Sequence, residues 1–247
     1  MKKKLLASLL VGSAVVGASL APLSAQATTT GTTPVTVGIE GGTLPDVSGD
    51  PNTVRPNPDA SNSNFDLLFI PRDFNFGKLS ISDDLTKPIP NIGDTAGSNG
   101  HIEAIGVGDL RGTKEGWHLT AQSNGMKLGN ESLQGNITTS LIASYDLEYN
   151  KDSNKYSTLT TAISAPELSP EIPNAKNWSM ILGGDAQLIA NAASGKGQGL
   201  WKFAMFTTSL NITTPYQQIK TGNYTGTITW NLVAGPSTPA PAPGPAN

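Results

Sequence analysis

The sequence predicts an all-β fold, an antiparallel β-sandwich of Greek-key-like type that forms a single domain. First, Gly (27 residues) and Pro (18 residues) are frequent in the 247-residue chain and charged residues make up only 14% of it, which favours short strands and turns over helices. Second, apolar residues recur at period two in several short segments separated by turn residues, as in β-sandwiches. Third, no segment after residue 27 has a convincing helical pattern.

Composition also limits the classes of function. The chain has no cysteine, so its stability must come from a core rather than from disulfides, and a chain of this length buries roughly 70% of its unfolded surface. Its formal net charge is −3. Without Lys2, Lys3 and Lys4 there are 13 basic residues against 19 acidic ones, a net charge of −6. This balance argues against nucleic acid as a partner and against binding of anionic polymers by bulk charge.

Residues 1–27 are predicted to be a secretory signal peptide. Three lysines precede an apolar stretch from Leu5 to about Leu20, and Ala25-Gln26-Ala27 provides small residues for cleavage before Thr28. No other segment is long enough to span a bilayer, so we expect no membrane span in the mature protein. A Leu-Pro-x-Thr-Gly motif is also missing, and covalent attachment to a cell wall is therefore not expected.

Residues 28–64 form a polar N-terminal segment. Val35–Ile39 alternates at period two and is a candidate strand, whereas 41–64 is predicted to be a long loop. Asp46, Asp50 and Asp59 lie in that loop, but their spacing does not match a calcium-binding EF-hand. A solvated loop is the preferred interpretation.

The predicted domain covers residues 65–234, and its strands follow in order. In the first half they are Phe65–Ile70, Ile102–Val107 and Trp117–Ala121, the last two forming a hairpin across a polar turn that carries Asp109 and Arg111. In the second half they are Ser140–Tyr149 with its hairpin partner Ser157–Ile163, Gln187–Ala190, Leu200–Phe206, a separate strand with Leu210 and Ile212, and the closing strand Tyr224–Leu232. Residues 235–247 form a Pro/Ala-rich tail that we expect to be extended and disordered.

Two strands share a Trp-x-Leu pattern. Trp117 and Leu119 lie two residues apart, as do Trp230 and Leu232, so each pair occupies one face of its strand. Large aromatics on the apolar face of an alternating strand usually pack into a core. The alternative is an aromatic platform for sugar rings, and Trp178, which follows a Pro-rich loop, is the tryptophan expected to be most exposed.

No motif predicts catalysis. Only two histidines, His101 and His118, are present, and without cysteine they give poor support for a metal site. Gly195-x-Gly-x-Gly is not a dinucleotide fingerprint because a strand rather than a helix follows it. We therefore expect no enzyme activity, no metal and no cofactor, although carboxylates or a triad brought together by folding remain an alternative.

The ordered motifs resemble the WxL domain, a cell-surface domain of low-GC Gram-positive bacteria. The C-terminal family signature, Tyr-x-x-x-Leu-Thr-Trp-x-Leu-x-x-x-Pro, is matched by Tyr224, Ile228, Thr229, Trp230, Leu232 and Pro236. The first motif is matched by Asp109-Leu110-Arg111-Gly112 and Gly116-Trp117-His118-Leu119, with supporting similarity at Phe74–Gly77 and Gly197–Trp201.

The resemblance implies a secreted surface protein that is attached non-covalently to the cell wall by binding peptidoglycan. The ligand-binding candidates that it implies are Trp117, Leu119, Tyr224, Trp230 and Leu232, with Asp109 and Arg111 as weaker candidates for polar contacts. Family members also occur with other secreted surface proteins. The alternative is therefore a structural subunit of an extracellular multi-protein complex whose main partner is another surface protein.

Overall fold

The computed structural model describes residues 32–49, 52–92, 102–159 and 165–237. The predicted signal peptide, most of the predicted tail and His101 lie outside these residues. The chain divides into two units, Met1–Gly38 and Ile39–Asn247. In the described part of the first unit, residues 32–38 form no strand, so the predicted strand Val35–Ile39 is not present, and its three apolar side chains are 83–92% exposed.

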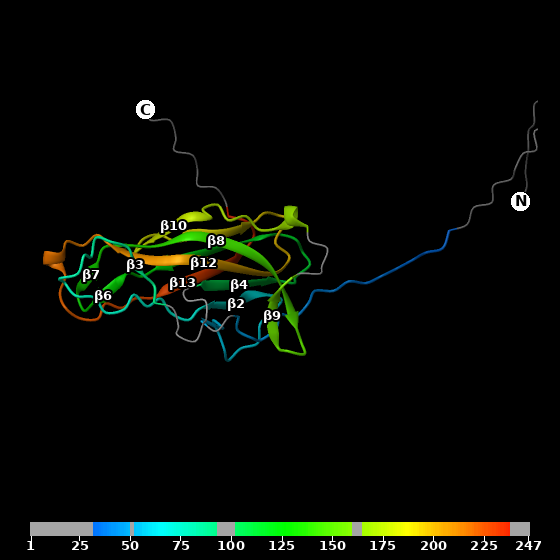
Figure 1. Cartoon of the computed structure of the whole chain (residues 1–247). Helices are drawn as coiled ribbons and strands as arrows, with labels where there is room; N and C mark the ends of the chain where they lie inside the picture. The colour runs from blue at the N-terminus through cyan, green and yellow to red at the C-terminus, as the bar shows by residue number, and fades with distance from the viewer. Residues whose placement is uncertain (1–31, 50–51, 93–101, 160–164, 238–247) are drawn as a thin grey trace, which may run out of the picture. The chain divides into compact units, whose positions relative to one another are not determined.

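The second unit is built from antiparallel strands (Figure 1). The large sheet has the order β1 (Thr53–Val54), β2 (Phe65–Pro71), β4 (Glu103–Asp109), β12 (Gly199–Ile212), β8 (Gly135–Asn150) and β10 (Lys176–Ile181), with β3 (Ile89–Pro90) on β12 and β9 (Lys155–Thr158) on β8. The small sheet has the order β11 (Gln187–Ala192), β5 (Trp117–Ser123) and β13 (Ile228–Ala234), and β6 (Met126–Leu128) pairs with β7 (Glu131–Leu133). Two short 3₁₀ turns, Pro166–Leu168 and Tyr216–Gln218, complete the elements. The all-β prediction is confirmed, and the narrower prediction of a Greek-key-like sandwich remains a prediction.

Both sheets contribute to one main hydrophobic core. Trp117, Leu119 and Ala121 of β5 have no exposed surface, as the period-two pattern of this strand predicts. They lie in one cluster of buried residues with side chains of the large sheet, including Trp201 and Phe203 of β12. Since burial of an aromatic side chain contributes about 1.5–3 kcal/mol, this cluster is the main source of stability.

The large sheet carries a second, smaller core on its other face. Its buried members are Leu44, Leu68, Phe69, Ala104 and Leu147. A β-bulge in β2 between Leu67 and Phe69 turns two consecutive residues toward this cluster. Gly106 makes room for it, because a Cβ there would lie 2.4 Å from the Phe69 ring. The segment that precedes β1 therefore packs on the sheet through Leu44.

Two further predictions about the strands are wrong. β4 and β5 do not form a hairpin, since residues 110–116 carry the chain from the large sheet to the small one. Leu210 and Ile212 do not form a separate strand, because β12 continues past Thr207, whose φ of 56° marks a local irregularity. The predicted hairpin of the 140–149 strand is confirmed in its pairing, with Asn150 opposite Lys155. Its partner β9 is Lys155–Thr158 rather than the predicted Ser157–Ile163, of which residues 160–163 lie outside the described residues.

The Trp178 side chain is also buried rather than exposed. It is 2% exposed, and its indole N–H donates to the carbonyl of Leu188 at 3.0 Å. This bond links β10 of the large sheet to β11 of the small sheet.

Candidate functional site

The first Trp-x-Leu motif is joined to the large sheet at one carbonyl group. The indole N–H groups of Trp117 and Trp201 both donate to the backbone oxygen of Gly197, at 2.9 and 3.0 Å. Gly197 has a φ of 76°, and a Cβ there would lie 2.4 Å from the Ala192 Cβ and 2.7 Å from the Trp117 indole nitrogen. Only glycine fits this position, since it combines a left-handed backbone with close packing. The turn at Gly197 is thus close-packed, and the strand β12 follows it, as expected from the sequence of the Gly195-x-Gly-x-Gly stretch.

Asp109 and Arg111 are predicted polar contacts, and the structure pairs them with each other. The guanidinium of Arg111 donates to both carboxylate oxygens of Asp109 at 2.8 Å. It also donates to Glu115 and to the Gly116 carbonyl, and it lies 3.7 Å from the ring centroid of Phe65. The hydrogen bonds to Asp109 raise the pKa of Arg111 further above its ordinary value.

This ion pair is largely buried, with side-chain exposures of 10% for Arg111 and 3% for Asp109. Breaking a buried ion pair by removing one partner is strongly destabilising. The pair holds the turn that carries the chain from β4 to β5.

The second Trp-x-Leu motif lies at the end of the small sheet. Trp230 and Leu232 on β13 face the main core but stay partly exposed, unlike their fully buried neighbours on β5. The Trp230 ring stacks on Phe74, with ring centroids 6.4 Å apart. Tyr224 precedes the strand, packs against the same core, and its hydroxyl accepts a hydrogen bond from the Lys220 backbone N–H.

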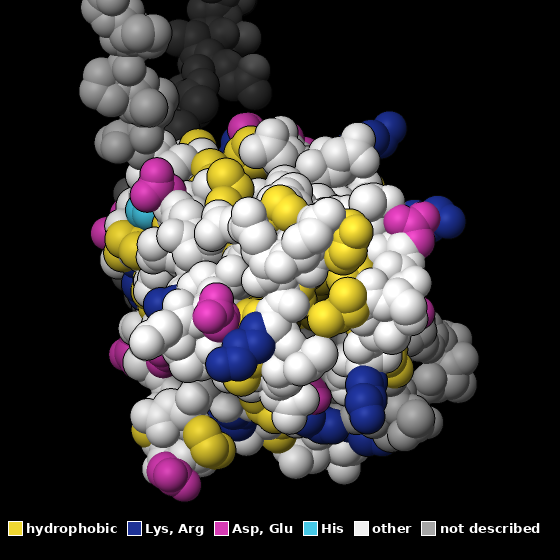
Figure 2. Space-filling model, turned by 90° about the vertical axis from the view of Figure 1, so that its left-hand side faces the viewer, with side chains coloured by type: hydrophobic (Ala, Val, Ile, Leu, Met, Phe, Trp, Pro, Cys, Tyr) yellow, Lys and Arg dark blue, Asp and Glu magenta, His cyan; other side chains and the backbone are white. Residues whose placement is uncertain are grey.

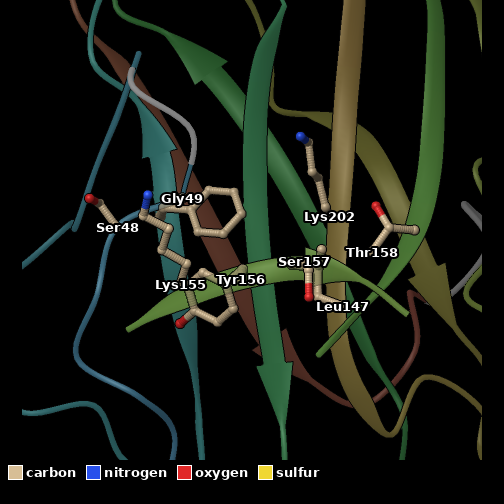
Figure 3. Close-up of a pocket in the computed structure, with 9 residues that line it drawn as sticks. Ser48, Gly49, Leu147, Lys155, Tyr156, Ser157, Thr158 and Lys202 are labelled. Atoms are coloured by element: carbon tan, nitrogen blue, oxygen red, sulfur yellow. The ribbon is translucent and has the colours of Figure 1, made fainter. Parts of the chain in front are cut away.

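A separate cavity of about 500 Å³ lies on the other face of the large sheet, above the second core (Figure 3). Its lining residues come from the segment before β1 and from β2, β8, β9 and β12: Ser48, Gly49, Phe69, Leu147, Lys155, Tyr156, Ser157, Thr158 and Lys202. They combine two lysines, two aromatic rings and four hydroxyl groups, one of them the phenol of Tyr156, and the described lining residues include no carboxylate. The cavity is therefore suited to a polar ligand that carries negative charge.

Tyr156 forms an aromatic wall of this cavity. Its ring packs against Phe69 and Tyr149 with centroid separations of 5.7 and 5.8 Å, and its hydroxyl donates to the Pro45 carbonyl at 3.4 Å. Burial, and then the neighbouring Tyr149, raise the pKa of Tyr156 well above its ordinary value. The phenol consequently stays neutral at physiological pH and provides a half-buried ring without negative charge.

A comparison with protein-family sequence models gives one match. Residues 24–236 match the family described as WxL domain, surface cell wall-binding. The chain belongs to the WxL family. Neither the search of the curated proteins nor the search of the solved structures gave a match.

The match establishes the general role of the chain. WxL domains are cell-wall-binding surface domains rather than an enzyme family, so this WxL protein is a cell-surface protein with the cell wall as its partner. No helix among the described residues is long and apolar enough to cross a membrane. Within the same residues, no group of three or more His, Cys, Asp or Glu side chains is placed to hold a metal ion.

The surface charge of the WxL domain is mixed. On the face shown in Figure 2, acidic and basic side chains are both present and hydrophobic side chains are interrupted by polar ones.

Sequence reasoning did not find the cavity residues. Lys155, Tyr156 and Lys202 belong to no family motif quoted above, and they are distant in sequence from Ser48 and Phe69. One available signal was Lys202, a charged residue in the middle of the apolar strand Leu200–Phe206. At period two its side chain lies on the face opposite Trp201 and Phe203, which is the face of the cavity.

Proposed function

We propose that this WxL protein is held at the cell wall non-covalently by direct binding of peptidoglycan, and that the cavity lined by Lys155, Tyr156 and Lys202 is the contact site. The observation that carries the proposal is that two lysines, an aromatic wall and several hydroxyl groups line one cavity of an acidic chain. Peptidoglycan offers matching groups, namely free carboxylates on its peptides and N-acetylated sugar rings. Charge-assisted hydrogen bonds from the lysines would supply affinity, and the ring of Tyr156 would pack on the ligand.

In this proposal the motif residues support wall binding by stabilising the fold, and they do not contact peptidoglycan. Trp117 and Leu119 have no exposed surface. Asp109 and Arg111 form an ion pair with each other. Tyr224, Trp230 and Leu232 pack against the same core, and the last two lie on β13 of the small sheet. Their substitution would therefore abolish wall binding together with folding, and not through loss of a ligand contact.

A pelleting assay with purified peptidoglycan tests the contact site. The double variant Lys155→Ala/Lys202→Ala should bind at least about tenfold more weakly, because each charge-assisted hydrogen bond contributes about 1.5–3 kcal/mol. A matched control, Lys151→Ala/Lys220→Ala, removes the same charge at exposed positions outside the cavity. Equal pelleting of the two folded variants would show that the cavity is not the contact.

The role of the motifs needs a second measurement on the same samples. Trp117→Ala and Trp230→Ala should each reduce pelleting and, in the same samples, lower the unfolding temperature. A variant that keeps the wild-type unfolding temperature and no longer pellets would instead make that tryptophan a ligand contact. Release of muropeptides from the wall by the wild-type protein would contradict a purely binding function.

A structural subunit of a multi-protein surface complex is the second candidate function. One observation favours it: β13 ends the small sheet and carries no charged residue, and uncharged edge strands are sites of strand addition. Recovery of a stoichiometric second surface protein from a surface extract, by a protein that does not pellet with peptidoglycan, would favour this function over the first.

A further inference from the structure

The outer side of β13 is a strand edge of the small sheet. In the described part of the chain, β13 pairs with β5 and with no strand on its other side. Its seven residues, Ile-Thr-Trp-Asn-Leu-Val-Ala, include neither a charged residue nor a proline. Proteins usually protect such edges with lysine, proline, bulges, very short strands or a covering loop. β13 has none of the first four, and the contact from the segment after β2 is the stacking of Phe74 on the Trp230 side chain.

The register shows which backbone groups face this edge. Gly235 N–H donates to the Gly116 carbonyl, and Asn124 N–H donates to the Thr227 carbonyl. Hydrogen-bonded pairs alternate along an antiparallel ladder, so the odd-numbered residues of β13 bond to β5. The N–H and C=O groups of Ile228, Trp230 and Leu232 therefore point outward, and no strand of the described residues pairs with them.

The core beneath the edge is also incompletely covered. Ile228, Trp230 and Leu232 face the main core yet remain partly exposed, whereas Leu119 on the adjacent strand has no exposed surface. A strand added next to β13 would cover these three side chains with every second residue of its own. Such a strand needs apolar residues at period two and no charge.

The same chain contains a segment with these properties. Residues 33–39, Thr-Pro-Val-Thr-Val-Gly-Ile, are uncharged and alternate, and Val35, Val37 and Ile39 are 92%, 83% and 90% exposed. The segment makes no strand pairing in the single chain. Its proline is at the start, where a strand tolerates it, and Thr36 would lie beside the polar face of β13 that carries Thr229 and Asn231.

We propose that residues 33–39 of a second copy of this chain add to the outer edge of β13, so that the protein self-associates by strand addition. The donor segment and the acceptor edge are different surfaces, and the contact is therefore heterologous. Two copies that exchange segments close into a dimer, whereas one-way donation builds an open chain of subunits. The inference is independent of the peptidoglycan contact, because the cavity residues take no part in it.

Sedimentation velocity over a range of concentrations tests the proposal, using the chain that begins at Thr28. The wild type should associate, and Val35→Asp/Val37→Asp should weaken association at least about tenfold, because it places two charges against an apolar face. Both substituted side chains are more than 80% exposed, so the fold should stay intact. The control, Thr32→Asp/Ser153→Asp, adds the same charge at exposed positions outside the strand and should associate like the wild type.

Amide hydrogen exchange identifies the edge. With rising concentration, the amides of Trp230 and Leu232 should exchange at least about tenfold more slowly, because they gain partners only in the assembly. The amide of Asn231, already bonded to β5, should change little. A monomer at every concentration, association that survives the aspartate pair, or concentration-independent protection of Trp230 and Leu232 would each overturn the proposal.

Discussion

Substitution of Gly197 by alanine should destabilise the WxL domain more than the same substitution at Gly195. Both glycines have left-handed backbones, with φ of 76° and 88°, and an L-residue in that region costs about 1–2 kcal/mol. At Gly195 nothing lies within 4 Å of the new Cβ, so this backbone strain is the whole effect.

At Gly197 the new Cβ would also meet the Ala192 Cβ at 2.4 Å and the Trp117 indole nitrogen at 2.7 Å. Overpacking of this kind costs about 1–3 kcal/mol. The two indole hydrogen bonds to the Gly197 carbonyl contribute about 1 kcal/mol each and would be weakened. We therefore expect a loss of about 3–5 kcal/mol, a large part of the 5–15 kcal/mol that stabilises a typical domain.

Urea unfolding, followed by tryptophan fluorescence, measures both variants under the same conditions. The Gly195→Ala protein should unfold at a slightly lower midpoint, and the Gly197→Ala protein at a much lower one or without a folded baseline. If the two free energies of unfolding agree within about 0.5 kcal/mol, close packing at the shared carbonyl does not stabilise the fold, and the argument for a glycine at this position is refuted.

Three further predictions concern single side chains. Arg111→Lys keeps the charge but loses the two-pronged contact with Asp109, so it should lower the free energy of unfolding by about 2–3 kcal/mol in urea titrations, and a change below 0.5 kcal/mol would contradict this. Trp230→Phe should remove most of the fluorescence that acrylamide quenches, because Trp117, Trp178 and Trp201 are at most 6% exposed; unchanged quenching would show that another tryptophan is accessible. Burial raises the pKa of Asp146 above 3.8, so the native state disfavours its ionised form and stability falls as the pH rises through the raised pKa. Asp146→Asn should therefore raise the unfolding temperature at pH 7 and have little effect below pH 3.8, and equal shifts at both pH values would exclude the carboxyl group as the cause.

Local patterns predicted the strand faces well. Trp117 and Leu119 share one buried face of β5 because the side-chain period of a strand depends only on neighbouring residues. The hairpin of β8 and β9 could be predicted for the same reason, since a short turn at 150–154 joins two alternating segments. These features need no information from distant parts of the chain.

Pairings between distant segments could not be predicted in this way. The polar turn between β4 and β5 suits a hairpin, but the chain uses it to change sheets, and only the contacts of Arg111 show why. The burial of Trp178 depends on the carbonyl of Leu188 in another sheet. The cavity residues converge from five segments of the chain, and no periodicity relates them.

The position of the last strands has a consequence for how the protein leaves the cell. β12 lies between β4 and β8, and β13 pairs with β5 across sequence separations of about a hundred residues, as in the bond between Thr227 and Asn124. A chain that emerges N-terminus first therefore lacks the centre of its large sheet and the partner of its first motif strand until its final quarter is outside. Such non-local pairing makes folding slow and late. We therefore expect the core to form only after the last quarter of the chain has emerged.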